Sequence, residues 1–172
     1  SPDQFTYFHG GGFDRSLLSF MQVDQDGNVN VSRLAALPHV TAGAGGFIDI
    51  TAHARQIVFS GYFTAGGLEL ALENGKLRIV KEGKARKFMR AVEHVTFSGR
   101  RARINRQDIT YVTERCVIKL DPAGLTVTEI APGVALARDV FAQVDIELRV
   151  SPNLKTMDAR LFKPEPMGLV LE

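Results

Sequence analysis

Tryptophan is absent from this sequence of 172 residues, and cysteine occurs once, at Cys116. A single cysteine excludes an intrachain disulfide and favours a reducing compartment, so we expect a cytoplasmic protein. Long apolar runs are also missing. None approaches the roughly 20 residues of a membrane-spanning helix, and the first ten residues do not resemble a signal peptide. The sequence therefore predicts no membrane partner.

Several catalytic signatures are missing as well. The sequence contains neither a complete Gly-x-Gly-x-x-Gly after a strand nor a glycine loop that ends in Gly-Lys-Ser or Gly-Lys-Thr, which argues against nucleotide-binding folds. The four histidines are scattered, so we expect no metal site. Ser60 lacks the preceding glycine of a hydrolase nucleophile elbow. Cys116 lies in an apolar alternation, which indicates a packed strand residue rather than a nucleophile.

The sequence is rich in glycine, with 16 residues, and 45% of its residues are hydrophobic. Short runs of Val, Ile and Thr favour one strand-rich domain of the α/β or α+β class. Turn residues predict three hairpins, with strands at 17–23 and 29–34, 68–72 and 76–80, and 109–120 and 125–130. We also expect buried strands at 5–8, 56–63 and 146–150 and helices at 47–55 and 134–144.

Two glycine-rich segments are candidates for a binding site. The segment from Gly43 to Gly46 can bring bare N–H groups against an anion or a developing oxyanion, although a tight turn needed only for packing is the alternative. The triple glycine at 10–12 lies between His9 and Asp14. These two side chains could orient a ligand or cap loop N–H groups. Neither segment decides the function alone.

Basic residues gather in the span 76–106, in which only Glu82 and Glu93 are acidic. The span could bind phosphates, as in a noncatalytic polyanion or nucleic-acid binding module, or it could be a solvated face. Single-strand binding usually places aromatic side chains among the cations, and only Phe88 and Phe97 lie there. We therefore expect no nucleic-acid partner.

The ordered motifs of the chain point to one family. They are His-Gly-Gly-Gly-Phe-Asp from residue 9, Asp-Gly-Asn-Val-Asn-Val-Ser-Arg from 26, Gly-Ala-Gly-Gly-Phe-Ile-Asp-Ile from 43, Phe-Thr-Ala-Gly-Gly-Leu from 63, Glu-Gly-Lys-Ala-Arg-Lys-Phe from 82, Tyr-Val-Thr-Glu-Arg-Cys-Val from 111 and Glu-Ile-Ala-Pro-Gly from 129. This series resembles the family I acyl-CoA transferases, in their propionate and short-chain acyl-CoA branch. The resemblance covers nearly the whole chain.

The resemblance implies an open-sheet α/β fold of the CoA-transferase type, of which residues 1–172 would form the C-terminal part of the second, catalytic domain. It implies an enzyme that exchanges CoA between a short-chain acyl-CoA and a free carboxylic acid by a ping-pong mechanism. CoA would be substrate and covalent intermediate, with no permanently bound cofactor, in a homo-oligomer. A 3-oxoacid acceptor, or hydrolase and lyase chemistry on the same scaffold, remains open.

The resemblance also assigns site residues. The family's Gly-x-Gly-Gly-Phe loop matches the predicted oxyanion and acyl-pocket residues Gly43, Gly45, Gly46 and Phe47. The predicted substrate and CoA contacts are Gly10, Gly11, Gly12, Thr64, Gly66, Gly67 and Lys84. The family's nucleophilic glutamate lies in a Glu-Ser-Gly or Glu-Asn-Gly motif upstream of the triple glycine, and only nine residues precede Gly10 here. We therefore expect the nucleophile and the N-terminal domain on the rest of the polypeptide or on a companion chain, and this chain alone to be inactive.

Overall fold

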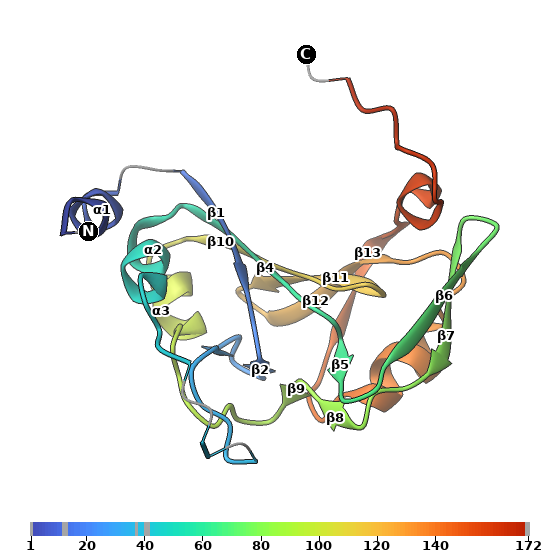
Figure 1. Ribbon diagram of the computed structural model, residues 1–172, viewed down its shortest axis with the longest axis horizontal. Coiled ribbons are helices and arrows are strands. Elements are labelled where there is room, and N and C mark those ends of the chain that lie inside the picture. Colours follow the sequence, from blue (N-terminus) through green and yellow to red (C-terminus); the bar gives the residue numbers. More distant parts are fainter. Residues whose placement is uncertain (1, 12–13, 37, 40–41, 171–172) are drawn as a thin grey trace.

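The computed structural model describes residues 2–11, 14–36, 38–39 and 42–170. Its centre is a six-stranded sheet in the order β1-β4-β10-β11-β12-β13 (Figure 1). The strands are β1 Arg15–Ser19, β4 Gln56–Ser60, β10 Asp108–Val112, β11 Cys116–Asp121, β12 Gly124–Ile130 and β13 Arg149–Thr156. β1, β4 and β10 run parallel, β11 is antiparallel to both of its neighbours, and β12 and β13 run parallel. The mixed open sheet with helices confirms the predicted α/β class.

Aromatic side chains fill the core on one face of this sheet. Along β4 and β10 alternate residues are buried, as expected for strands with one face on a core. The Phe59 ring stacks on Tyr111 with centroids 5.6 Å apart and on Phe47 at 5.9 Å. Cys116 is fully buried in the same core, which confirms its prediction as a packed strand residue.

The first aromatic run forms a helix, so the predicted buried strand at 5–8 is wrong. α1 spans Pro2–His9 and buries none of its residues within this chain. Phe5 and Phe8 lie on one face of α1, because residues three apart in a helix are neighbours. That face meets Gly46 at the start of α2, Phe47–His53, which agrees with the predicted helix at 47–55.

Two predicted hairpins are confirmed. β6 Glu69–Glu73 pairs antiparallel with β7 Lys76–Lys81, and Asn74 and Gly75 between them have φ of 53° and 73°, as a type I′ turn requires. β11 and β12 form the other hairpin. The prediction of one long strand at 109–120 is wrong, because β10 ends at Val112 and β11 begins at Cys116. The Thr113 hydroxyl accepts the backbone N–H of Cys116 at 3.0 Å and closes a turn between β10 and β11.

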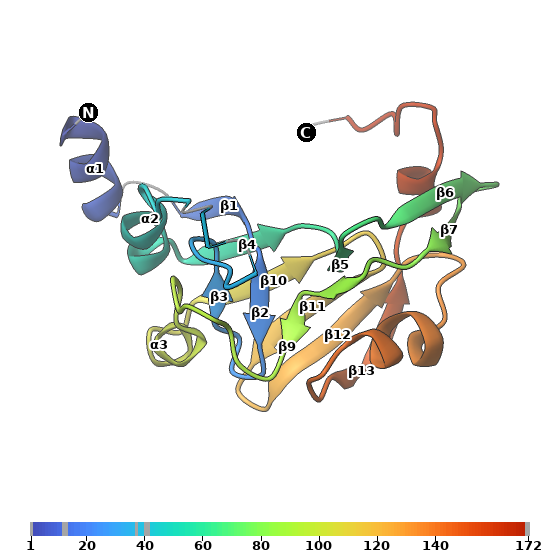
Figure 2. The same cartoon turned by 60° about the horizontal axis from the view of Figure 1, so that its bottom comes forward.

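The remaining hairpin was half correct. β2 Gln22–Asp24 pairs antiparallel with β3 Val29–Asn30, but residues 17–19 belong to β1 in the central sheet. Residues 134–144 form two short turns of other helix types, η1 Leu136–Val140 and η2 Phe141–Gln143, and β13 begins later than the strand predicted at 146. The other elements are β5 Thr64–Ala65, β8 Ala85–Arg86, β9 Phe88–Met89, α3 Gly99–Ile104 and η3 Ala159–Phe162. β9 runs parallel to β2 in a small sheet apart from the central one (Figure 2).

Candidate functional site

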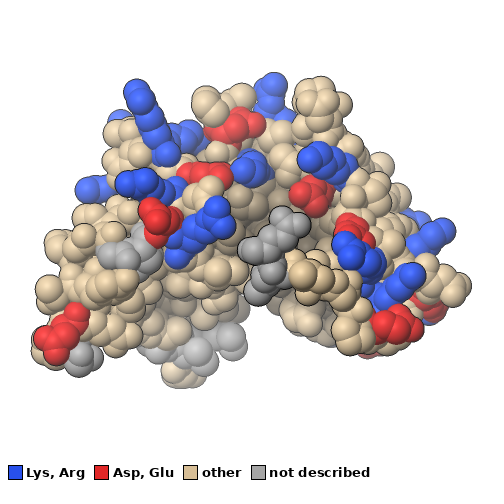
Figure 3. Space-filling view, turned by 90° about the horizontal axis from the view of Figure 1, so that it is seen from above, with Lys and Arg blue, Asp and Glu red and all other residues tan. Residues whose placement is uncertain are grey.

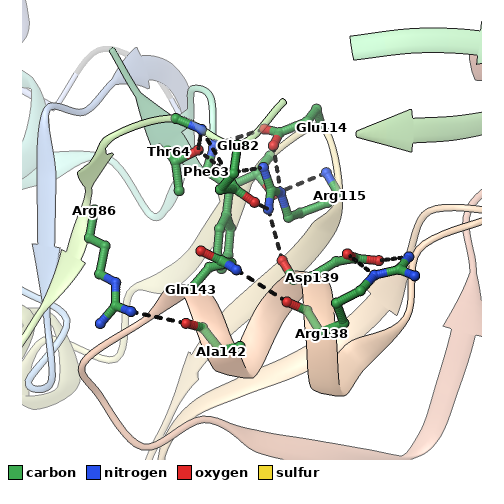
Figure 4. Close-up of polar contacts among 12 residues, drawn as sticks. Phe63, Thr64, Glu82, Arg86, Glu114, Arg115, Arg138, Asp139, Ala142 and Gln143 are labelled. Carbon is green, nitrogen blue, oxygen red and sulfur yellow. Dashed lines mark hydrogen bonds and ion pairs between the residues drawn. The ribbon is translucent and has the colours of Figure 1, made fainter. Parts of the chain in front are cut away.

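The parallel strands β1, β4 and β10 end at the same edge of the sheet, and charged groups gather in the segments that follow two of them. In open α/β sheets ligands usually bind at this carboxyl edge. β4 leads to Phe63 and Thr64, and β10 leads to Glu114 and Arg115. Glu82, which follows β7, joins them (Figure 4). We call the last four of these residues, Thr64, Glu82, Glu114 and Arg115, the buried ion cluster.

Arg115 is the centre of the buried ion cluster, and its side chain is 0% exposed. Its Nη1 donates to Oε2 of Glu82 at 2.9 Å and to the carbonyl oxygen of Asp139 at 2.8 Å. Its Nε donates to Oε1 of Glu114 at 2.7 Å. A buried guanidinium needs such partners because an unpaired buried charge is very costly. Arg115 therefore joins the β10–β11 turn, the segment after β7 and η1.

The two carboxylates of the cluster also hold the segment after β4. Oε2 of Glu114 accepts the backbone N–H of Phe63 at 2.7 Å. The Thr64 hydroxyl donates to Oε1 of Glu82, which also accepts the N–H of Gly83 at 3.1 Å. The guanidinium of Arg115 lies over the Phe63 ring, 4.8 Å from its centroid. The position of residues 63–64 thus depends on Arg115 through its two carboxylate partners.

Both partners of the Arg115–Glu82 pair stay ionised. Burial alone would raise the pKa of Glu82, but hydrogen bonds from Arg115 and Thr64 outweigh it, and the pKa lies below its usual value. Burial would lower the pKa of Arg115, yet the hydrogen bond with Glu82 and the charge of Glu114 raise it above its usual value. Near neutral pH, Glu82 and Arg115 therefore form a fixed pair of opposite charges rather than a proton-transfer pair.

The structure brings together four of the residues predicted to contact substrate. β5 pairs antiparallel with β8, which places Thr64 and the exposed Gly66 and Gly67 beside the exposed Lys84. The N–H of Lys84 donates to the carbonyl oxygen of Gly66 at 3.2 Å. Gly66 and Gly67 have φ of 78° and 92°, which favours glycine. Thr64 is buried and links this loop to the buried ion cluster, and we call residues 64–67, together with Lys84 beside them, the Thr64 loop.

The predicted oxyanion loop is open on its outer side. Gly43 and Gly45 are exposed, and a Cβ built at either would meet nothing within 4 Å. Gly45 has φ of 52°. A Cβ at Gly46 would lie 3.3 Å from the Phe8 ring, so α1 closes the loop from that side. The Phe47 ring is buried against Phe59, and it holds the loop from the core side instead of facing the open side.

Gly10 and Gly11 lie at the end of α1, beside α2. The N–H of Gly10 donates to the carbonyl oxygen of Thr6 at 2.9 Å, and Gly11 has φ of 71°, so both close the end of α1. They precede the amino end of β1 and are not brought to the Thr64 loop, which follows the carboxyl end of β4. Gly12 lies outside the described residues. His9, next to them, has Nδ1 3.4 Å from Oδ1 of Asp49.

The basic span does not form one surface. Its residues are spread over the β6–β7 hairpin, the segment 84–90 and α3, and the hairpin and α3 lie at opposite sides of the molecule in Figures 1 and 2. Arg78 pairs with Glu73 and Lys81 pairs with Glu69. In the face shown in Figure 3, blue and red side chains are interspersed. This distribution gives no support to a polyanion-binding module.

Arg115 and Glu114 were missed by sequence reasoning as site residues, although one signal was present. Both interrupt the apolar alternation around Cys116, where charged side chains need buried partners. Within the described residues, no group of three or more His, Cys, Asp or Glu side chains is placed to hold a metal ion. Likewise, no described helix is long and apolar enough to cross a membrane.

Comparison with known proteins gives close relatives. The chain is 46% identical over 168 residues to acetate CoA-transferase YdiF of Escherichia coli, and 45% identical over 167 residues to caffeate CoA-transferase of Acetobacterium woodii. These matches cover 98% and 96% of this chain but only 31% and 32% of the relatives. The chain thus spans about a third of the length of these curated relatives. No protein-family model matches it.

Solved structures agree with this finding. The crystal structure of the acyl-CoA transferase YdiF apoenzyme from Escherichia coli O157:H7 superposes with a TM-score of 0.93, at 46% identity, over 98% of this chain and 32% of that one. A structure of the same protein as a thioester complex with CoA matches equally well. Glutaconate CoA-transferase from Acidaminococcus fermentans has a TM-score of 0.60 at 18% identity, covers 84% of this chain and 53% of its own, and supports the fold alone.

Proposed function

Because this chain is a segment of the acyl-CoA transferase family, we propose that the protein that contains it moves CoA between a short-chain acyl-CoA and a free carboxylic acid. The identity of 46% over 98% of the chain, together with the TM-score of 0.93, is the observation that carries this proposal. The exchange would need no permanently bound cofactor, since CoA itself is the group transferred.

The proposed reaction is ping-pong and passes through a covalent carboxylate. A glutamate attacks the thioester carbon, which gives an acyl-glutamyl anhydride and releases CoA as its thiolate. The thiolate then attacks the glutamyl carbonyl, which forms a glutamyl-CoA thioester and frees the first carboxylate. A second acid reverses these two steps and leaves as its CoA thioester. Covalent catalysis divides one difficult exchange into easier steps. The CoA thioester complex solved for YdiF supports this intermediate.

In this scheme the Gly43–Gly46 loop supplies the N–H groups that stabilise the thioester oxygen as it gains negative charge. The exposure of Gly43 and Gly45 supports this role, because nothing in the described residues occupies the space where their Cβ atoms would stand. Phe47 anchors the loop through the core. These assignments are proposals that rest on the family motif and on this open geometry.

The Thr64 loop has a second proposed role, as a contact surface for the substrate. Gly66, Gly67 and Lys84 are exposed on it, and the buried ion cluster fixes its base. Gly10 and Gly11 are separate from this surface, so a direct role for them needs a substrate that reaches the end of α1. Arg115 is proposed as a positioning residue, because its partners hold residues 63–64 and no part of it is exposed.

We place the nucleophilic glutamate and the N-terminal domain in the part of the polypeptide, or on the companion chain, that this sequence does not include. The length of the relatives, about three times that of the matched segment, supports this division. The homo-oligomer and the cytoplasmic location stay predictions.

The first experiment is the denaturing intact mass of the whole protein before and after incubation with butyryl-CoA. We expect a gain equal to one CoA minus one water on a glutamate, which disappears when acetate is added and acetyl-CoA is released. Peptide mapping then locates the glutamate. The absence of both the adduct and the exchange would overturn the proposed function, whereas release of butyrate without transfer to acetate would indicate a hydrolase.

A further inference from the structure

A pocket of about 520 Å³ lies beside the carboxyl end of β1. Its walls are mainly apolar, and they include Phe20, Met21, Leu34, Ala65 and Met89. Cavities of this size are typical of small-molecule sites, where apolar walls surround a few polar groups. The pocket adjoins the Thr64 loop, since Gly66 also lines it.

Besides Arg86, the cation Lys87 lines this pocket. Its side chain is half-buried, and Nζ lies 4.0 Å from the centroid of the Phe20 ring. A Cβ built at Gly61 would lie 3.1 Å from Nζ, so the glycine at the end of β4 leaves room for the ammonium group. Within the described part of the chain, Nζ has no hydrogen bond and no ion pair.

The other charged side chains of the pocket have partners. Arg86 pairs with Asp145 and donates to the carbonyl oxygen of Ala142 at 3.1 Å. Glu93 accepts from Nε2 of Gln22 at 2.9 Å and from a backbone N–H of the segment that carries Leu34. Lys87 is therefore the charged group of this lining that is available to a ligand.

The surroundings of Lys87 make its charge costly. Burial lowers the pKa of Lys87 to about 8, and the charge of Glu114 opposes this effect only in part. Glu114 itself is hydrogen-bonded to Arg115 and to the N–H of Phe63. An anion that entered the pocket would stabilise the ammonium group, because a nearby opposite charge favours the charged form.

We propose that this pocket binds a short aliphatic carboxylate, with its carboxylate on Lys87 and its chain against Phe20, Met21 and Met89. This inference rests on the proposed function, since such an acid is both the product and the acceptor of the exchange. The apolar walls favour longer chains over acetate, at about 0.8 kcal/mol per buried methylene, which is close to a fourfold gain in affinity. The pocket thus selects the acid, and the Gly43–Gly46 loop activates the thioester.

The first test measures the binding without any catalytic turnover. The whole protein, free of CoA, is methylated with formaldehyde and a borane reductant at pH 8, with and without sodium butyrate, and each lysine is quantified by peptide mass spectrometry. We expect Lys87 to react readily and butyrate to slow its reaction at least threefold, more than acetate does. The exposed Lys155 is the internal control and should be unaffected.

A Lys87 that reacts equally with and without butyrate would overturn the proposal. A Lys87 that never reacts would also overturn it, because another part of the protein would then fill the pocket. Neither outcome depends on whether the CoA adduct forms. Protection of Lys87 without a CoA adduct would support the carboxylate pocket and contradict the proposed function. A CoA adduct without protection of Lys87 would support the proposed function and contradict the carboxylate pocket.

The second test compares Lys87→Met with Lys155→Met in the whole protein. Lys87→Met removes a charge-assisted hydrogen bond to the carboxylate of the acid. We therefore expect the KM for butyrate to be at least tenfold higher in this variant, while the CoA adduct still forms from butyryl-CoA. Lys155→Met should change neither the KM for butyrate nor the formation of the CoA adduct. An unchanged KM in Lys87→Met would contradict the assignment of the carboxylate to this side chain.

Discussion

Nη1 of Arg115 lies 2.9 Å from Oε2 of Glu82, and the pair joins two segments 33 positions apart in the sequence. The guanidinium is fully buried, whereas 28% of the Glu82 side chain is exposed. Neither group could be placed there alone, since a buried charge without a partner is strongly destabilising. The pair is therefore a condition for the local fold of residues 63–64, which the Glu82 carboxylate holds through the Thr64 hydroxyl.

Replacement of Arg115 with methionine should destabilise the protein. The carboxylates of Glu82 and Glu114 would lose their buried partner, and loss of one partner from a buried pair costs about 3–5 kcal/mol. Guanidinium denaturation of the whole protein measures the loss. Arg78→Met, which removes an exposed pair with Glu73, is the matched control and should change little. An equal loss of stability in the two variants would contradict the conclusion that the buried pairs of Arg115 stabilise the fold.

Acid should weaken the fold partly through Glu82. Its pKa is lower in the folded protein than in the unfolded chain, so its stabilisation is fully present above the unfolded value of about 4.3 and is lost as the pH falls through the folded value. Denaturation midpoints between pH 7 and pH 3 should therefore fall more steeply for the wild type than for Glu82→Gln. Parallel pH profiles for the two proteins would show that Glu82 does not contribute.

Gly83→Ala should disturb the Thr64 loop. A Cβ there would lie 2.5 Å from the carbonyl oxygen of Ala65. This backbone atom cannot move away unless the pairing of β5 with β8 is disturbed. Such overpacking costs about 1–3 kcal/mol, and we expect turnover of the whole enzyme to fall as well. For stability, Gly43→Ala is the control, since its Cβ meets nothing within 4 Å. Wild-type stability and kinetics in Gly83→Ala would refute this geometry.

The thiol of Cys116 should be inert in the folded protein. Burial raises its pKa to about 12, and the Thr113 hydroxyl opposes this only in part. Because the thiolate is the reactive form, iodoacetamide at pH 8 should modify Cys116 only after denaturation. Peptide mass spectrometry at this position measures the labelled fraction. Rapid labelling under native conditions would mean that the β10–β11 region opens locally.

Local signals were enough to predict some elements and not others. The β6–β7 hairpin could be predicted from Asn74-Gly75, because these two residue types readily adopt the positive φ that the turn requires. The run at 5–8 was assigned wrongly because a short apolar run fits a strand or a helix equally well, and only the contact with α2 decides. The motifs identified the family, but the Arg115 pairs were hidden because Glu82 reaches Arg115 only after β7, β10 and β11 are in place.

The strand order of the sheet has a kinetic consequence. β11 and β12 are joined by a tight turn and can pair early, whereas Ile57 of β4 must find both Ile109 of β10 and Ser16 of β1 far along the chain. Distant pairings close long loops before they gain contacts, so they form slowly. The parallel edge that carries the proposed site should be the last part of the sheet to form. Until it forms, the Phe59 face of β4 is exposed to other chains, and refolding should therefore lose yield as protein concentration rises.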